Sequence, residues 1–95
     1  MLIVNQNKDE LINFENIMNI GICGENEEYS ISAGFIVGRD DNYRELGVYK
    51  TEERAKEVLQ KIIKFYDDTQ IKMMIQSAMM LNSASSDFVY QMPEE

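Results

Sequence analysis

The spacing of hydrophobic residues changes once along this chain, near residue 50. Up to that point apolar and polar residues alternate in short runs, most clearly over residues 18–23 and 29–37, and this period of two is typical of half-buried strands. Turn-forming residues follow these runs at 24–28 and 38–42. Residues 1–50 are therefore predicted to form an antiparallel β-meander of four to five strands.

From residue 51 the period lengthens to about 3.6 residues, which is the repeat of an α-helix. Thr51 is suited to cap this helical segment, residues 51–83, and the polar run at 67–70 leaves open whether it is one long α-helix or a broken one. The face expected to lie on the sheet consists of Ala55, Val58, Leu59, Ile62 and Tyr66. With a short C-terminal strand at 87–92, the chain is predicted to be a single α+β domain spanning residues 1–95.

The second half of the helical segment carries more apolar residues than one face holds. They include Ile71, Met73, Met74, Met79 and Met80. At the helical repeat, Ile71 and Met74 share one face, whereas Met73 and Met80 lie on another. Because a thin sheet covers only one face of a helix, we predict that these residues form the interface of a homo-oligomer. The alternative is a central helix buried within the monomer.

The amino-acid composition excludes several classes of protein. With 95 residues, of which 44% are hydrophobic, the chain is too apolar to be disordered. The longest uncharged run, residues 73–86, is too short and too polar to span a bilayer, and the N-terminal residues lack the features of a signal peptide. We therefore expect a cytoplasmic protein without a membrane partner.

The chain is strongly acidic, with 17 acidic residues against 9 basic residues and a net charge of −8. A surface of this charge repels nucleic-acid backbones and anionic lipids, so direct binding of nucleic acid is not expected. The acidic excess is explained either by solubility or by docking onto a basic protein partner, and the sequence leaves both open.

The sequence contains no recognisable catalytic motif. It has no histidine and a single cysteine, which excludes an internal disulfide and argues against a zinc site. Cys23 lacks a base that would activate it, and between Gly21 and Gly24 it is expected to be a small buried thiol. The acidic turns at 25–28 and 40–41 lack the ligand spacing of a metal-binding loop. We expect a non-enzymatic protein without a cofactor or a metal.

Two small groups of residues are candidates for binding a ligand. Arg39 and Arg44 flank Tyr43 at a predicted turn, where two guanidinium groups and a ring are suited to grip a phosphate and stack on a base. Phe88 and Tyr90 lie two positions apart on the terminal strand, so both rings fall on one face and are suited to wall a pocket between subunits. Ordinary roles stay open for both groups, namely neutralising nearby acids and packing in the core or between subunits.

Four stretches of the sequence carry a family resemblance. They are residues 3–9 (IVNQNKD), 12–17 (INFENI), 46–59 (LGVYKTEERAKEVL) and 90–95 (YQMPEE). Together they resemble small uncharacterised proteins of phages and prophages of low-GC Gram-positive bacteria. The layout of a sheet followed by a helical segment is similar to the Thoeris anti-defence sponge family, whose members are oligomers that sequester cyclic nucleotide signals without cleaving them.

The resemblance implies a phage-derived anti-defence protein acting in the cytoplasm of the host cell. Its ligand would be a small cyclic-nucleotide-type immune signal, held by Arg39, Tyr43 and Arg44 with Phe88 and Tyr90 as pocket walls. A competing hypothesis is an anti-CRISPR protein, which would use its acidic surface to inhibit a basic host-defence protein. A structural or regulatory phage accessory protein is the third.

Overall fold

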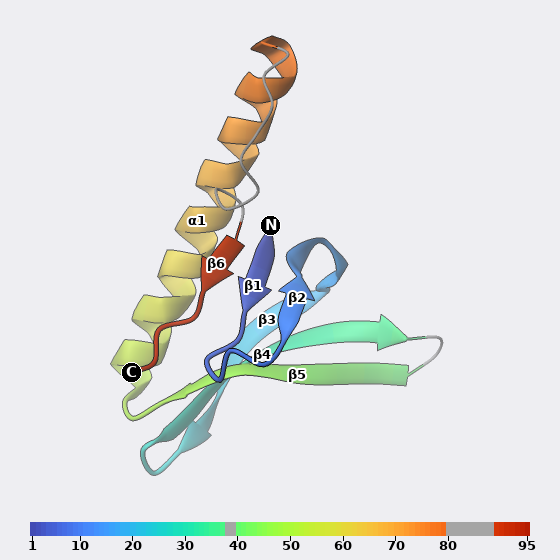
Figure 1. The fold of residues 1–95 in the computed structure, drawn as a ribbon. Helices are drawn as coiled ribbons and strands as arrows, with labels where there is room; N and C mark the ends of the chain where they lie inside the picture. The colour runs from blue at the N-terminus through green and yellow to red at the C-terminus, as the bar shows by residue number, and fades with distance from the viewer. Residues whose placement is uncertain (38–39, 80–88) are drawn as a thin grey trace.

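The structure is a computed structural model that describes residues 1–37, 40–79 and 89–95, with side chains at 1–36, 42–75 and 89–95. Figure 1 shows its elements, which in chain order are β1 (Leu2–Val4), β2 (Leu11–Asn13), the 3-10 turn η1 (Phe14–Asn16), β3 (Asn19–Glu25), β4 (Glu28–Val37), β5 (Asp40–Tyr49), α1 (Glu52–Met79) and β6 (Val89–Gln91). The predicted α+β class is confirmed, with an antiparallel meander, one helix and a short C-terminal strand.

The larger sheet is an antiparallel meander in the order β3-β4-β5. Asn26 and Glu27 join β3 to β4 with φ angles of 53° and 67°, the left-handed conformation that a two-residue hairpin turn requires. An irregularity in the pairing of β4 with β5, between Ile31 and Ser32, leaves one extra residue on β5 and bends the hairpin.

The smaller sheet has the order β2-β1-β6, and β1 pairs antiparallel with β2 and parallel with β6. The first two strands therefore do not continue into the meander. The chain turns away after β2 because Asn13 caps η1, its side-chain oxygen accepting a hydrogen bond of 3.0 Å from the Glu15 N–H. The core is therefore bounded by two separate three-stranded sheets and not by one broad sheet.

Helix α1 runs without a break through residues 67–70, so the helical segment is one long helix over the described residues. At its start, the Thr51 hydroxyl accepts a hydrogen bond of 3.1 Å from the Arg54 N–H, as predicted for a cap. Thr69 is the type of residue that caps helices, but here it is only 1% exposed and its hydroxyl donates to the Tyr66 carbonyl (2.8 Å). It lies within the helix instead of starting a second one.

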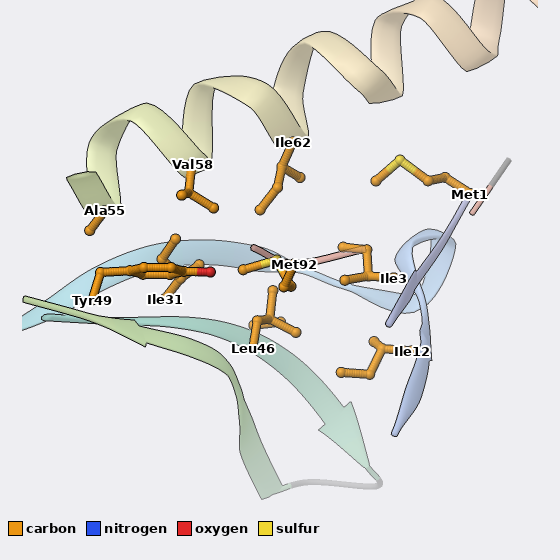
Figure 2. Close-up of a cluster of buried hydrophobic side chains, with 11 residues drawn as sticks. Met1, Ile3, Ile12, Ile31, Leu46, Tyr49, Ala55, Val58, Ile62 and Met92 are labelled. Carbon is orange, nitrogen blue, oxygen red and sulfur yellow. The ribbon is translucent and has the colours of Figure 1, made fainter. Parts of the chain in front are cut away.

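The core lies between α1 and both sheets (Figure 2). The helix contributes Ala55, Val58 and Ile62, which are completely buried and lie on the predicted face. The larger sheet contributes Ile31, Ala33, Leu46 and Tyr49, and the smaller sheet with its flanking residues contributes Met1, Ile3, Ile12 and Met92. Burial of a large aliphatic side chain stabilises the fold by about 1.5–3 kcal/mol, so this cluster holds the two sheets together.

The C-terminal tail is fastened to β5 by the side chain of Gln6. Its Nε2 donates to the carbonyl oxygens of Val48 (3.0 Å), Pro93 (3.3 Å) and Glu94 (2.7 Å), and its Oε1 accepts from the Val48 N–H (2.9 Å). The Tyr49 hydroxyl donates to the same Pro93 oxygen (2.8 Å). Burial of this hydroxyl raises the pKa of Tyr49 to about 12.

The prediction that Cys23 is buried is wrong, because the structure shows its side chain exposed. Ile22 and Cys23 are neighbours on a strand and point to opposite faces of the sheet. Ile22 packs against the core, which leaves Cys23 on the outer face opposite Ser30 of β4. A small apolar residue beside glycines therefore marks here a solvent-facing strand position.

Candidate binding site

An open hollow of about 820 Å³ lies between β2, the C-terminal end of β4 and the N-terminal half of β5. Its lining residues are Glu10, Leu11, Ile12, Asn13 and Asn16 on one side and Phe35, Ile36, Asn42, Tyr43 and Arg44 on the other. The hollow forms because β4 and β5 are ten residues long and extend past β2, which has three (Figure 1). Its volume is that of a small-molecule site, for which about 300–1,000 Å³ is usual.

Arg44 is the one described cation that lines this hollow. It pairs in register with the buried Ala33, so it projects from the core-facing side of β5. Its Nη1 lies 2.9 Å from Oε2 of Glu10, which brings a residue from before β2 against the meander. Both partners are partly exposed, so the ion pair itself adds little stability. An anionic ligand would have to displace the Glu10 carboxylate from the guanidinium.

Tyr43 borders the hollow, but its ring lies on the other face of β5. A Cβ atom added to Gly34 would lie 3.1 Å from Cε1 of Tyr43 and would overlap the Asn19 side chain, so both side chains cover Gly34. Neighbouring residues of a strand point to opposite faces. The structure therefore does not bring the side chains of Tyr43 and Arg44 to one ligand.

Of the other predicted ligand residues, the structure describes Tyr90 alone. Arg39 and Phe88 lie outside the described residues. Tyr90 packs on α1, with its ring centroid 5.3 Å from that of Phe65, and burial raises the pKa of its hydroxyl. The structure thus places Tyr90 between β6 and the helix.

Sequence reasoning missed Phe35 and Asn42, which face each other across the hairpin beside Arg44. Their position follows from the hairpin register, in which Val37 pairs with Asp40. Counting back two residues on each strand from that pair places Phe35 opposite Asn42, so the register was a signal for both residues. Glu10 is different, because it lies 34 positions from Arg44 and no local pattern joins them.

A second hollow, of about 360 Å³, lies where α1 begins. Its lining residues are Val48, Lys50, Thr51, Arg54, Glu94 and Glu95. Arg54 donates from Nε (2.9 Å) and Nη2 (2.7 Å) to the main-chain oxygen of Glu95, and Nη1 lies 2.6 Å from Oε1 of Glu57. This arginine is fully engaged in holding the tail, which makes the second hollow a poorer candidate for a ligand.

The end of α1 exposes the apolar residues that were predicted to form an interface. Ile71, Met73 and Met74 are 56%, 46% and 71% exposed, and Figure 1 shows the helix extending beyond both sheets there. At about 100° per residue, Ile71 and Met74 lie roughly opposite the face that carries Ile62, whereas Met73 continues that face. The side chains of Met79 and Met80 lie outside the described residues. The described part of this helix end is thus apolar on two sides.

Two further properties bear on function. Among the residues that the structure describes, no three acidic or cysteine side chains gather closely enough to hold a metal ion. Over the same residues, no helix combines the length and the apolar character needed to cross a membrane.

Comparison with known proteins returns no relative from which a role could be transferred. No family model, no curated protein and no solved structure matches the chain.

Proposed function

We propose that this chain is a non-enzymatic binding protein that acts as a homo-oligomer and sequesters a small cyclic-nucleotide-type ligand in the hollow between β2 and β5. The observation that carries the proposal is the lining of the hollow, where one arginine, one aromatic residue and three asparagines border one open space, namely Arg44, Phe35, Asn13, Asn16 and Asn42. The phage anti-defence role that the sequence resemblance implies is part of the same proposal.

The chemistry of these groups suits a nucleotide. A guanidinium group binds phosphate oxygens through two parallel N–H donors, which makes Arg44 the phosphate anchor. Phe35 is half-buried and packs on the core, so its ring offers a fixed surface for stacking a base. Asn42 sits opposite Phe35 and carries both a donor and an acceptor for a base edge. Glu10 opposes phosphate binding because it occupies Arg44 in the free protein.

Two substitutions with opposite expected effects test this site. Arg44→Gln should remove the gain in melting temperature that a cyclic nucleotide confers, whereas Glu10→Gln should enlarge it by freeing the guanidinium. Lys64→Gln and Glu53→Gln change the charge equally at exposed positions of α1 and serve as controls. The measurement is thermal unfolding with a panel of cyclic nucleotides, followed by chromatography to show that the ligand is recovered intact. If no cyclic nucleotide raises the melting temperature, or if Glu10→Gln weakens the effect, the nucleotide proposal fails.

The assembly is proposed to form through the exposed end of α1. At micromolar protein concentration, replacing Ile71 and Met74 together with glutamate should yield monomers, because four extra charges would face one another across a dimer. Gln60→Glu adds a charge on the exposed part of the same helix and should leave the mass of the assembly unchanged. Analytical ultracentrifugation measures the mass of the assembly in solution. At micromolar protein concentration, a monomeric parent protein or a double variant that still assembles would contradict this interface.

A second candidate function is that of an anti-CRISPR protein, an acidic inhibitor that docks on a basic protein. The observation that favours this function is an acidic end of the molecule. The β3–β4 turn with Glu25, Glu27 and Glu28 lies beside the start of α1 with Glu52 and Glu53, because Tyr29 of β4 pairs with both Gly24 and Tyr49. All five glutamates are exposed. Such a field attracts a basic surface and weakens with salt.

The two candidates separate by experiment. For the inhibitor, binding to a purified CRISPR effector should weaken steeply with salt and compete with nucleic acid, and replacing Glu25, Glu27 and Glu28 together with glutamine should weaken it further. Glu10→Gln should change binding little, because Glu10 lies away from the acidic end. Binding that is insensitive to salt and to the triple variant would argue against this function.

A further inference from the structure

Strand β3 (Asn19–Glu25) forms an open edge of the larger sheet. It pairs with β4 on one side only, and the strand order β3-β4-β5 leaves its other side without a neighbouring strand in the part of the chain that the structure describes. An open edge of this length is a template on which another strand can pair.

The main-chain groups that face outward along this edge can be identified. In a two-residue hairpin the residues that flank the turn exchange both hydrogen bonds, here Glu25 and Glu28. Along an antiparallel strand, the main-chain N–H and C=O groups of successive residues point to opposite sides. Those of Cys23 and Gly21 therefore point toward β4, and those of Ile20, Ile22 and Gly24 point away from it. Over the described residues, these three outward positions receive no main-chain hydrogen bond from any turn, loop or other segment.

The edge of β3 also lacks the features that protect other sheet edges. From residue 19 to residue 24 it carries no charge, no proline and no bulge, although the chain as a whole has a charge of −8. On the opposite edge of the sheet, Gln6 occupies the main-chain groups of Leu46 and Val48 of β5. The edges β2 and β6 are only three residues long. Of the described edges, only that of β3 is both longer than three residues and uncharged up to its last residue, so a second copy can pair along it without placing like charges opposite each other.

We propose that β3 pairs antiparallel with β3 of a second copy, which joins two three-stranded sheets into one sheet of six strands. With Gly21 on the two-fold axis, Ile20 of each copy lies opposite Ile22 of the other, and the outward N–H and C=O groups of these residues bond to each other. Ile20 and Ile22 are half-buried, and each gains an apolar neighbour on the core-facing side. Glu25, the one charge on the strand, lies at opposite ends of the pair.

This register also accounts for Met18, which directly precedes β3 and is 64% exposed. In the paired sheet it comes beside Gly24 of the second copy and loses part of that exposure. The interface is independent of the ligand hollow and of the end of α1, so it goes beyond the proposed function. If both interfaces form, each copy has two contacts and the protein assembles beyond a dimer.

Hydrogen exchange measured residue by residue tests the pairing. The amides of Gly21 and Cys23 face β4 and should be protected at every protein concentration. The amides of Ile20, Ile22 and Gly24 should exchange rapidly at micromolar concentration and slow by roughly tenfold or more at millimolar concentration. This alternating response is specific to pairing at the β3 edge, because a dimer through α1 leaves all five amides unchanged. If the three outward amides do not respond to concentration, the proposal is wrong.

A matched pair of variants provides the second test. Gly21→Glu fits the monomer, since a Cβ atom there meets nothing within 4 Å, but it places two like charges directly opposite each other in the pair. Gln60→Glu adds the same charge on α1. Of the two variants, only Gly21→Glu should abolish the concentration-dependent protection of the outward amides.

Cross-linking provides a further readout. In the proposed register the Cys23 thiols of the two copies lie about 14 Å apart, so a bis-maleimide of that reach should link two copies of the parent protein but not two copies of Gly21→Glu. Equal protection or equal cross-linking in both variants would overturn the proposal.

Discussion

Replacing Gln6 with alanine is expected to lower the free energy of unfolding by about 2–3 kcal/mol. The Gln6 amide has two N–H donors, which three carbonyl oxygens of Val48, Pro93 and Glu94 share, and its oxygen accepts from the Val48 N–H. The variant therefore loses about three hydrogen bonds, each worth about 1 kcal/mol. A domain of this size has a total stability of about 5–14 kcal/mol, so the loss is a large fraction of it.

Thermal unfolding followed by circular dichroism measures this effect. For a domain of this length, the expected loss corresponds to a decrease in melting temperature of about 10–20 °C. Gln6→Glu should be at least as harmful, because it places a carboxylate against carbonyl oxygens. Gln60→Ala removes the same side chain from an exposed helix position and should change the melting temperature little. If Gln6→Ala and Gln60→Ala unfold at the same temperature, the Gln6 contacts do not hold the tail.

Three further predictions concern the core, the β3–β4 turn and pH. Ile62→Ala should lower stability by about 2–5 kcal/mol in urea titrations, because this side chain is completely buried. Gly24→Ala should cost about 1–3 kcal/mol by the same assay, since its φ of 147° and the nearby Glu28 carbonyl exclude a Cβ atom, whereas Gly21→Ala should be neutral or slightly stabilising. The pKa of Tyr49 rises from about 10 in the unfolded chain to about 12 in the folded one, so its stabilisation is complete below pH 10 and is lost as pH rises through 12. Tyr49→Phe should lose less stability over that range, and an equal loss would contradict this assignment.

The types of the elements were predictable because they follow from local patterns. The alternation before residue 50 gave the strands of the meander, and the helical repeat placed Ala55, Val58 and Ile62 on the buried face of α1. The partner of a strand leaves no such local trace. Leu2–Val4 has the sequence of an ordinary strand, and nothing in its pattern indicates that it pairs with the other end of the chain.

The candidate site was predictable only in part. Arg44 was identified as a charged residue beside a turn, but its partner Glu10 comes from a distant segment and was not foreseen. Grouping Tyr43 with Arg44 treated neighbours in sequence as neighbours in space, although adjacent residues of a strand face opposite ways. The same rule, applied from the buried Ile31, would have placed its register partner Ile22 inside and Cys23 outside.

The parallel pairing of β1 with β6 has a consequence for the order of folding. The β3–β4–β5 meander consists of neighbouring hairpins, whose short loops close quickly. The smaller sheet is different, because β1 and β2 have three residues each and such a short hairpin is marginal by itself. It is completed only when β6 arrives and Met92 enters the core. We expect the meander and α1 to form first, and a growing chain to lack its full core until the tail has docked beside the first strand.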